Sequence, residues 1–357
     1  QKYMETKEQY KDCILFYRLG DFYEMFFDDA LVASKELEIT LTGKSCGLEE
    51  RAPMCGIPYH AVEGYLSKLV SRGYKVAICE QVEDPKLAKG LVKREVIRVV
   101  TPGTNLNVQS LEAGKNNYLL SIAYTPDGIG ISAADVTTGD YYVTEVEDLK
   151  KLNDELMKYE PSEIICNEAF LVSGFDVNDL KSRLHISVNA LESHMFDDDG
   201  CRRILMKHFK VNTLIGLGVE EFPTGLLAAG ALLQYLYDTQ KTDLEHFTHI
   251  YPYLTSKYML LDSSTRRNLE LTETLREKQK RGSLLWVLDK TKTAMGARLL
   301  RNYIEQPLIE KDEMEKRLDA IQELNQDNLD RQLLAKNAQI KSLQNQINAH
   351  FMYNVLE

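Results

Sequence analysis

The sequence lacks the cysteine spacing of disulfide-rich proteins and of zinc sites. Among its 357 residues, the cysteines form no Cys-x-x-Cys pair, and several lie in apolar runs. There are six of them: Cys13, Cys46, Cys55, Cys79, Cys166 and Cys201. This pattern indicates reduced thiols and argues against a disulfide framework or a structural zinc.

Long hydrophobic runs are also missing. The longest, residues 225–237, is interrupted, and it is shorter than the roughly 20 apolar residues that a membrane-spanning helix needs. The N-terminus begins Gln1-Lys2-Tyr3 and shows no apolar signal-peptide core. We therefore expect a cytoplasmic protein without membrane contact. Because the chain does not begin with methionine, we also expect a trimmed start or a fragment.

What is present is an ordinary globular composition, with 44% hydrophobic and 27% charged residues. At about 100–200 residues per domain, the length predicts two or three domains. The net charge of −11 argues, taken alone, against nucleic-acid binding. The charge is uneven, however: residues 1–110 carry 15 basic and 16 acidic residues, whereas residues 111–357 carry 28 and 38.

A short basic strip stands out in the first part of the chain. Residues 86–98 contain one acid, Glu95, and five basic residues, which are Lys86, Lys89, Lys93, Arg94 and Arg98. Screening confines electrostatic fields to about 8 Å at physiological salt, so such a strip can contact phosphate even on an acidic protein. A solvated loop is the alternative interpretation.

Periodicity and turn signals divide the chain into three units and a tail. We expect an α/β unit over residues 1–110, a mixed α/β unit over 111–240, an all-α unit over 241–325 and an atypical helical tail over 326–357. Residues 53–58, with a proline at each end, predict a rigid loop, and residues 104–117 predict a linker.

Several single elements follow from the same patterns. Strands are expected at residues 13–18, 39–42, 74–82, 95–100, 118–124, 130–136, 140–146, 163–166 and 257–261. Helices are expected near residues 28–37, 62–73, 148–159, 198–209, 224–239, 283–288, 293–304 and 311–357, and another from a Ser263 or Ser264 cap to Leu271.

The segment 20–27, Gly-Asp-Phe-Tyr-Glu-Met-Phe-Phe, carries the main functional hypothesis. In an extended segment, Phe22 and Glu24 project from one face, because side chains alternate along a strand. An exposed ring can wedge between base pairs, and the unstacking that this requires is easier at a mispaired step. A neighbouring carboxylate can accept a hydrogen bond from a displaced base. The alternative is that Phe22 and Phe26 fill a core.

Six segments in the same order resemble one family. They are residues 15–26, 53–61, 99–104, 135–139, 225–239 and 261–270. Together they are similar to the mismatch-reading domain, the connector and the start of the lever region of bacterial MutS mismatch-repair proteins, over residues 1–325. The resemblance implies an α/β mismatch-recognition domain, a ribonuclease-H-like connector and an all-α lever fragment.

The resemblance also implies roles for individual residues. Phe22 corresponds to the wedge, Glu24 to the acceptor for the mispaired base, and Met54 to a residue near the opened groove. Arg94 and Arg98 are candidate phosphate contacts on the ground of charge alone. The implied ligand is double-stranded DNA with mispairs or small loops, so the resemblance also implies a protein associated with the nucleoid. The implied partners are a second copy of the chain and a MutL-type repair protein.

The family uses ATP and magnesium, but this sequence has no G-x-x-x-x-G-K-[ST] loop. We therefore expect no ATP hydrolysis, no cofactor and no metal in this chain. The sequence also raises two enzyme or metal hypotheses. The first is nuclease chemistry at Asp135, with Asp140 and Glu145 nearby. The second is a metal at the His246-x-x-His249 spacing.

The tail departs from the family resemblance. Residues 336–357 resemble the phosphoacceptor helix of a sensor histidine kinase, with Ala349 in place of the usual proline and His350 at the phosphorylated position. Two interpretations are a join of two unrelated genes and a chance match on a Gln/Asn-rich helix. In neither do we expect His350 to act, because the kinase ATP-binding domain is absent.

Two functions therefore remain open from the sequence. The favoured one is recognition of mispaired or unpaired bases by Phe22 and Glu24. The alternative is a protein-interaction fragment built on the connector, without useful DNA binding, and the net charge favours it.

Overall fold

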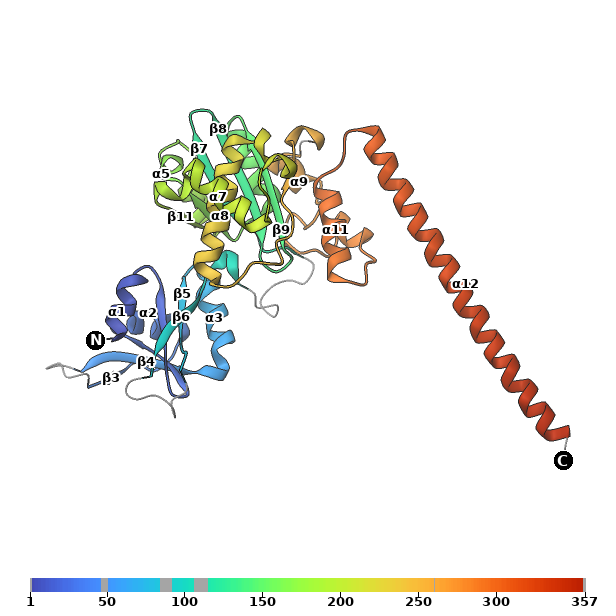
Figure 1. Ribbon diagram of the computed structural model, residues 1–357, viewed down its shortest axis with the longest axis horizontal. Coiled ribbons are helices and arrows are strands. Elements are labelled where there is room, and N and C mark those ends of the chain that lie inside the picture. Colours follow the sequence, from blue (N-terminus) through green and yellow to red (C-terminus); the bar gives the residue numbers. More distant parts are fainter. Residues whose placement is uncertain (1, 46–50, 84–91, 106–114, 260, 356–357) are drawn as a thin grey trace. The chain divides into compact units, whose positions relative to one another are not determined.

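The computed structural model describes residues 2–45, 51–83, 92–105, 115–259 and 261–355 (Figure 1). The side chains of residues 263, 324 and 342–355 lie outside this description. Contacts divide the chain into two compact units. The first comprises Gln1–Thr255 and Leu261–Glu305, and the second comprises Ser256–Leu260 and Gln306–Glu357.

The first unit begins with a six-stranded sheet in the order β3-β4-β2-β1-β5-β6. Its strands are β1 (Ile14–Leu19), β2 (Phe22–Phe26), β3 (Thr42–Lys44), β4 (Ala52–Pro58), β5 (Val76–Gln81) and β6 (Arg94–Val100). The strands β1 and β5 are parallel, and the other neighbours are antiparallel. Four helical segments join the sheet: α1 (Lys2–Gln9), α2 (Phe27–Leu37), η1 (Tyr59–Ala61) and α3 (Val62–Ser71).

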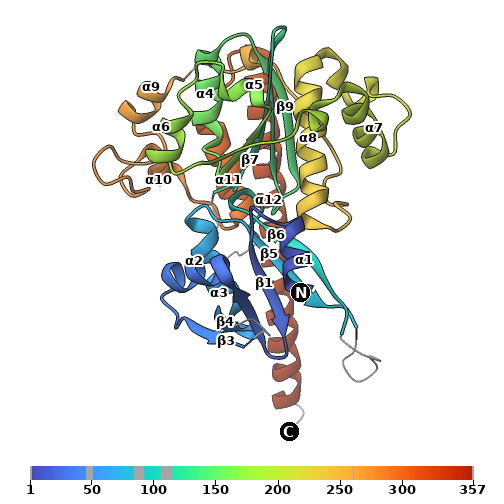
Figure 2. The same cartoon turned by 90° about the vertical axis from the view of Figure 1, so that its left-hand side faces the viewer.

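The two faces of this sheet are covered differently, as Figure 2 shows. The helices α2 and α3 bury one face, because their apolar residues recur at helical spacing and pack on the inward residues of β1, β2 and β4. On the other face, Tyr3 and Tyr10 from the α1 region pack over β1 and β5. Tyr3 also packs edge-on against Phe26 at the end of β2, with 5.0 Å between the ring centroids, whereas Phe22 at the start of β2 is exposed.

A tight turn, η2 (Pro102–Thr104), leads towards the second sheet. Thr101 and Thr104 form a reciprocal capping box, and Pro102 occupies the first helical position, where its missing N–H is not needed. The predicted linker at 104–117 falls mostly on residues 106–114, which lie outside the described residues.

The second sheet also has six strands, in the order β11-β10-β7-β8-β9-β12. They are β7 (Leu119–Thr125), β8 (Gly128–Asp135), β9 (Asp140–Val146), β10 (Glu163–Cys166), β11 (Ser187–Ala190) and β12 (Tyr251–Pro252). The strands β7, β8 and β9 form an antiparallel meander, and β10 pairs in parallel with both β7 and β11. This confirms the predicted mixed α/β character.

Helices cover both faces of the second sheet, as Figure 2 shows. One face packs against α4, α5 and α6, and the other against α7 and α8. The helical segments are α4 (Leu149–Tyr159), α5 (Glu168–Leu171), α6 (Val177–Ser182), η3 (Ser193–Phe196), α7 (Asp198–Phe209), η4 (Ile215–Leu217), η5 (Val219–Glu221) and α8 (Pro223–Gln240). As its all-round apolar sequence predicts, α8 is buried along most of its length.

The last part of the first unit contains the helices α9 (Ser263–Asn268), α10 (Leu284–Leu288) and α11 (Ala294–Glu305), joined by turns and irregular segments. The predicted cap of the first of these helices was wrong. A carboxylate oxygen of Asp262 accepts the N–H of Thr265 at 2.7 Å, so Asp262 is the N-cap. That helix also ends at Asn268 and not at Leu271.

The second unit contains most of η6 (Thr255–Lys257) and the 45-residue helix α12 (Lys311–Val355). The predicted strand at 257–261 was wrong. Among the described residues of this segment, only Tyr258 forms a β-bridge, an isolated antiparallel one with Leu308. The N–H of Met259 donates to the carbonyl of Pro307 at 2.8 Å. The predicted helix at 311–357 is confirmed over Lys311–Val355 as α12, and residues 356–357 lie outside the described residues.

Two further predictions in the first sheet need correction. Residues 53–58 are not a loop but most of strand β4, whose central residues Cys55 and Ile57 are buried. The strand expected at 39–42 begins only at Thr42. The prediction of reduced thiols agrees with the described residues. Five cysteines are buried and unbridged: Cys13, Cys55, Cys79, Cys166 and Cys201. Cys46 lies outside the described residues. None of the described helices is both long and apolar enough to cross a membrane.

Candidate functional site

The hairpin of β1 and β2 positions the first candidate residues. Leu19 pairs with Phe22, so only Gly20 and Asp21 form the turn. Gly20 has φ of 61°, a conformation that glycine adopts without steric penalty. The tight turn places Phe22 at the very start of β2, at the tip of the hairpin.

Alternation along β2 then separates the side chains, as predicted for an extended segment. Tyr23 and Met25 enter the core beneath α2 and α3. Phe22 and Glu24 lie on the opposite face, because alternate residues of a strand share a face. Phe22 is 48% exposed, which is unusual for a large aromatic residue in a strand, and so it does not fill the core.

The neighbouring strand β4 forms the floor beside these residues. Gly56 pairs with Glu24, Pro58 with Phe22, and Met54 with Phe26. A Cβ on Gly56 would lie 3.7 Å from Cγ of Glu24 and 4.0 Å from Cδ1 of Phe22, so both side chains lean over the glycine. An open hollow of about 630 Å³ results, lined by Phe22, Glu24, Glu38, Ile39, Thr40, Thr42, Met54, Cys55 and Gly56. The structure thus brings Phe22, Glu24 and Met54 together.

Sequence reasoning missed the partner of Glu24. Nζ of Lys44, at the end of β3, lies 2.6 Å from Oε2 of Glu24. The same ammonium lies 5.6 Å from the ring centroid of Phe26. Lys44 and Glu24 are 20 positions apart, and no local pattern pairs them.

A second missed contact supports the hairpin tip. The guanidinium of Arg18 stacks on the ring of Tyr59, with Cζ 3.7 Å from the ring centroid. The N–H of Tyr59 donates to the carbonyl of Asp21 at 3.0 Å. Tyr59 is itself 42% exposed. The end of β4 is therefore fastened to the turn that carries Phe22.

The two candidate arginines lie on different faces. Arg94 pairs in register with Gln81, on the face of Glu24, and its Cζ lies 5.6 Å from the ring centroid of Tyr17. Its Nε donates to the carbonyl of Arg18 at 2.7 Å. Arg98 pairs with Ile78 on the helix-covered face, and its Nη2 donates to the carbonyl of Thr104 at 2.9 Å. Lys86 and Lys89 lie outside the described residues.

The carboxylates of the second sheet have structural partners. Asp135 is fully buried, and its oxygens accept hydrogen bonds from Asn116, from the N–H of Asn117 and from both the N–H and hydroxyl of Thr137. Glu145 accepts the N–H groups of Thr224 and Gly225 at the start of α8. These contacts support a structural role for both carboxylates.

The described residues contain no side-chain cluster that supports a metal site. No group of three or more His, Cys, Asp or Glu side chains that could hold a metal occurs in that part of the chain. Nδ1 of His249 lies 2.8 Å from the hydroxyl of Thr248, and burial lowers the pKa of His246. His350 belongs to α12, but its side chain lies outside the described residues.

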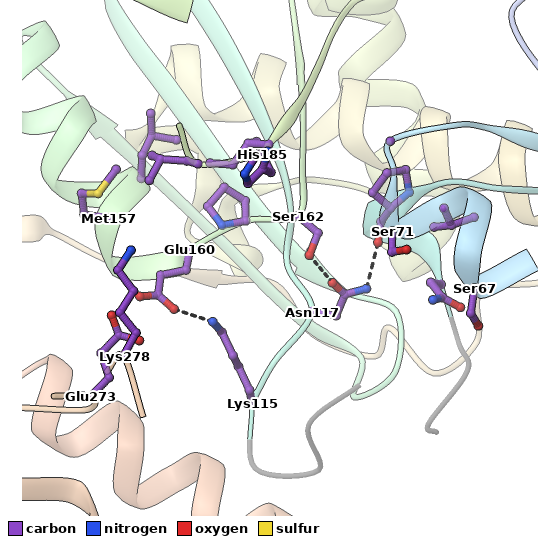
Figure 3. Close-up of a pocket in the computed structure, with 18 residues that line it drawn as sticks. Ser67, Ser71, Lys115, Asn117, Met157, Glu160, Ser162, His185, Glu273 and Lys278 are labelled. Atoms are coloured by element: carbon purple, nitrogen blue, oxygen red, sulfur yellow. Dashed lines mark hydrogen bonds and ion pairs between the residues drawn. The ribbon is translucent and has the colours of Figure 1, made fainter. Parts of the chain in front are cut away.

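A more enclosed hollow, of about 480 Å³, lies elsewhere in the first unit. Its described lining includes residues of α3, η2 and α4, and no residue of β2, β3 or β4. Figure 3 shows Lys115 directed at Glu160, with 2.6 Å between Nζ and Oε2, and Asn117 beside Ser162. The amide of Asn117 also donates to the carbonyl of Pro102 at 3.1 Å. These contacts pair the polar groups of the lining with one another, so we assign no ligand to this hollow.

Comparison with known sequences identifies three consecutive domains. The models of MutS domain I, MutS domain II and MutS domain III match residues 1–109, 117–248 and 264–350. The domain III match continues through residue 350, and no comparison supports a resemblance of residues 336–357 to a histidine kinase. The two-gene interpretation of the tail therefore lacks support.

Curated relatives agree with these matches. The chain is 69% identical over 325 residues to a DNA mismatch repair protein MutS of Lachnoclostridium phytofermentans, covering 91% of this chain and 35% of that protein. It is 54% identical over 327 residues to the MutS of Ruminiclostridium cellulolyticum, and the match covers 91% of this chain and 37% of that protein. It is 50% identical over 327 residues to the MutS of Clostridioides difficile, and the match covers 92% of this chain and 34% of that protein. The chain thus spans about a third of the length of these relatives, and it belongs to the MutS family of DNA mismatch repair proteins.

Proposed function

We propose that this chain reads mispaired or unpaired bases in duplex DNA for mismatch repair. The observation that carries the proposal is the 48% exposed ring of Phe22 at a hairpin tip, beside Glu24, in the segment that matches MutS domain I. The curated relatives are DNA mismatch repair proteins, which supports the same function here.

The chemistry follows from the open face. The ring of Phe22 enters the base stack at a deformable step, where a mispair reduces the free energy needed for unstacking. Glu24 then accepts a hydrogen bond from the edge of the displaced base. Met54 packs near the opened groove, where its flexible thioether side chain adapts to different bases.

Contacts with the DNA phosphate backbone increase the affinity without selecting the mispair. Arg94 is the better of the two arginine candidates, because it shares the face of Glu24. Arg98 ranks below it, because its side chain lies on the helix-covered face and donates to Thr104.

We further propose that residues 111–240 form a ribonuclease-H-like connector. The antiparallel meander β7–β9, followed by α4 and the parallel strands β10 and β11, supports this arrangement. We propose that residues 1–110, 241–325 and 326–357 form the mismatch domain, the start of the lever and a helical tail. In the whole protein, ATP and magnesium, a second copy and a MutL-type partner complete the repair function.

The test is binding to a fluorescent duplex with one G·T mispair or one unpaired T, compared with a perfect duplex, at low salt. The parent chain should prefer the mispaired duplex, and Phe22→Ala should bring the ratio of the two affinities to about one, because the wedge is the selective element. Ile97→Ala, which removes a 45% exposed apolar residue from β6, is the matched control and should keep the preference.

The same titration addresses the alternative function, a connector that binds proteins without useful DNA binding. The acidic balance of residues 111–357 favours that alternative. Genuine phosphate contacts make the affinity fall steeply with salt. A parent chain that shows neither salt-dependent binding nor a preference for the mispair would contradict mismatch recognition.

A further inference from the structure

The open face contains an ion pair that the mismatch chemistry does not explain. Oε2 of Glu24 lies 2.6 Å from Nζ of Lys44, within the range of a charge-assisted hydrogen bond. The Glu24 side chain is only 16% exposed, whereas that of Lys44 is 42% exposed. Glu24 is therefore the more shielded partner, and the side chain of Lys44 remains partly accessible to solvent.

We propose that Lys44 is a positioning residue for mismatch recognition. It holds Glu24 through Oε2 and leaves Oε1 to accept the hydrogen bond from the displaced base. This inference rests on the function proposed above and adds a residue to that site.

The fold explains how Lys44 reaches Glu24 from another strand. The strand β4 lies between β2 and β3, and Gly56 is the β4 residue opposite Glu24. Lys44 pairs with Ala52, four residues from Gly56 along β4, so its long side chain reaches Glu24 diagonally across the face. The hydroxyl of Thr42 donates to the carbonyl of Met54 at 3.2 Å and so fixes the short strand β3 beside β4.

The geometry favours positioning over a phosphate contact. A carboxylate has two oxygens and about four acceptor positions, so one ammonium donor does not saturate it. The contact restricts the rotamers of Glu24 before DNA binds, and such preorganisation reduces the entropy lost on binding. It also neutralises a carboxylate that must approach the phosphate backbone, where an unpaired negative charge would be repelled.

The test uses the same two duplexes and the 357-residue chain. Lys44→Met keeps the aliphatic stem near Phe26 and removes the ammonium. It should reduce the ratio of mispaired to perfect-duplex affinity by about threefold to tenfold, the effect of one weakened charge-assisted hydrogen bond. Lys44→Arg should restore most of the ratio, because it can still donate to Oε2. Lys68→Met, which neutralises an exposed lysine on α3, is the matched control and should leave the ratio unchanged.

A double-mutant cycle with Glu24→Gln separates the two possible roles of the ammonium. If Lys44 acts through Glu24, Lys44→Met should lower the ratio no further in the Glu24→Gln background. A phosphate contact would instead lower both affinities equally, reduce the salt slope by about one and leave the ratio intact. That second result would overturn the positioning role.

The outcomes also separate this inference from the proposed function. Suppose that the parent chain prefers the mispair and that Phe22→Ala abolishes this preference. If Lys44→Met nevertheless keeps the preference, then only the proposed role of Lys44 is contradicted. If the parent chain shows no preference, the proposed function and the role of Lys44 fail together. Thermal melting of each variant checks the fold, and loss of the ratio in a folded Lys44→Met with rescue by Lys44→Arg supports the inference.

Discussion

The main-chain N–H of Gly103 donates a hydrogen bond of 3.1 Å to Oε2 of Glu163. Glu163 is fully buried at the start of β10, and its other oxygen accepts hydrogen bonds from Tyr235 at 2.7 Å and from Asn189 at 3.1 Å. Gly103 belongs to the turn that follows the first sheet, so a single carboxylate links that turn to the second sheet. The partners compensate the burial of the charge.

The first prediction concerns this carboxylate. Glu163→Gln replaces one acceptor oxygen by an NH₂ group. In either carboxylate position this group faces a hydrogen-bond donor, the N–H of Gly103 or the amide of Asn189. We expect a loss of about 1–3 kcal/mol in the free energy of unfolding, the usual effect of leaving a buried hydrogen-bonding group unsatisfied. Urea denaturation measures it. Glu168→Gln, an exposed glutamate on α5, is the control, and an equal loss in both variants would contradict the assignment.

A second prediction follows from the contact between Gly130 and the start of α8. A Cβ on Gly130 would lie 2.0 Å from the carbonyl oxygen of Thr224 and 2.6 Å from the nitrogen of Gly225. Because both atoms belong to the backbone, α8 must move. We expect Gly130→Ala to lower the free energy of unfolding by about 1–3 kcal/mol, as overpacking in a core does.

The control for Gly130→Ala is another glycine with free space around it. A Cβ on Gly64, within α3, meets nothing within 4 Å among the described atoms. Gly64→Ala should therefore raise the free energy of unfolding by about 0.5–1 kcal/mol, because alanine loses less backbone entropy in a helix. Similar destabilisation by both substitutions would show that α8 tolerates displacement.

The second sheet illustrates what the sequence alone could predict. The strands at 118–124, 130–136, 140–146 and 163–166 were placed to within about two residues, because apolar stretches there end at clear turn signals. Phe22 and Glu24 were placed on one face for the same local reason, the two-residue period of a strand.

Long-range pairing explains what the sequence could not predict. Residues 53–58 read as a loop because Pro53 and Pro58 cannot donate to a ladder. Each lies near an end of β4, however, so the central residues still pair with β2. Lys44 was missed because its contact with Glu24 depends on the pairing of β3 with β4. Similarly, Arg98 falls on the covered face because the register of β6 shifts beside Ile78.

A third prediction concerns the thiols. Burial raises the pKa of Cys55 and Cys79 to about 11 and that of Cys13, Cys166 and Cys201 to about 12. Because the thiolate is the reactive form, these cysteines should resist a disulfide reagent at pH 8. In a Cys46→Ser chain mixed with a chromogenic disulfide reagent, we expect almost no reaction over minutes in buffer. In urea, all five remaining thiols should react and release the coloured product. Fast native reaction of any of the five would contradict their burial.

The last prediction returns to the floor of the open face, where Gly56 lies beneath Phe22 and Glu24. A Cβ there would lie 3.4 Å from the carbonyl oxygen of Tyr23 and 3.7 Å from Cγ of Glu24, both ordinary van der Waals contacts. Gly56→Ala should therefore fold normally and keep the preference for a mispaired duplex. Gly56→Val adds two methyl groups beyond that Cβ, and the nearest groups able to move are the side chains of Glu24 and Phe22. We expect Gly56→Val to lose most of the preference while its melting temperature stays close to that of Gly56→Ala. Fluorescence anisotropy with the two duplexes measures the preference, and a Gly56→Val chain that discriminates as well as the parent would show that recognition does not depend on this arrangement of Phe22 and Glu24.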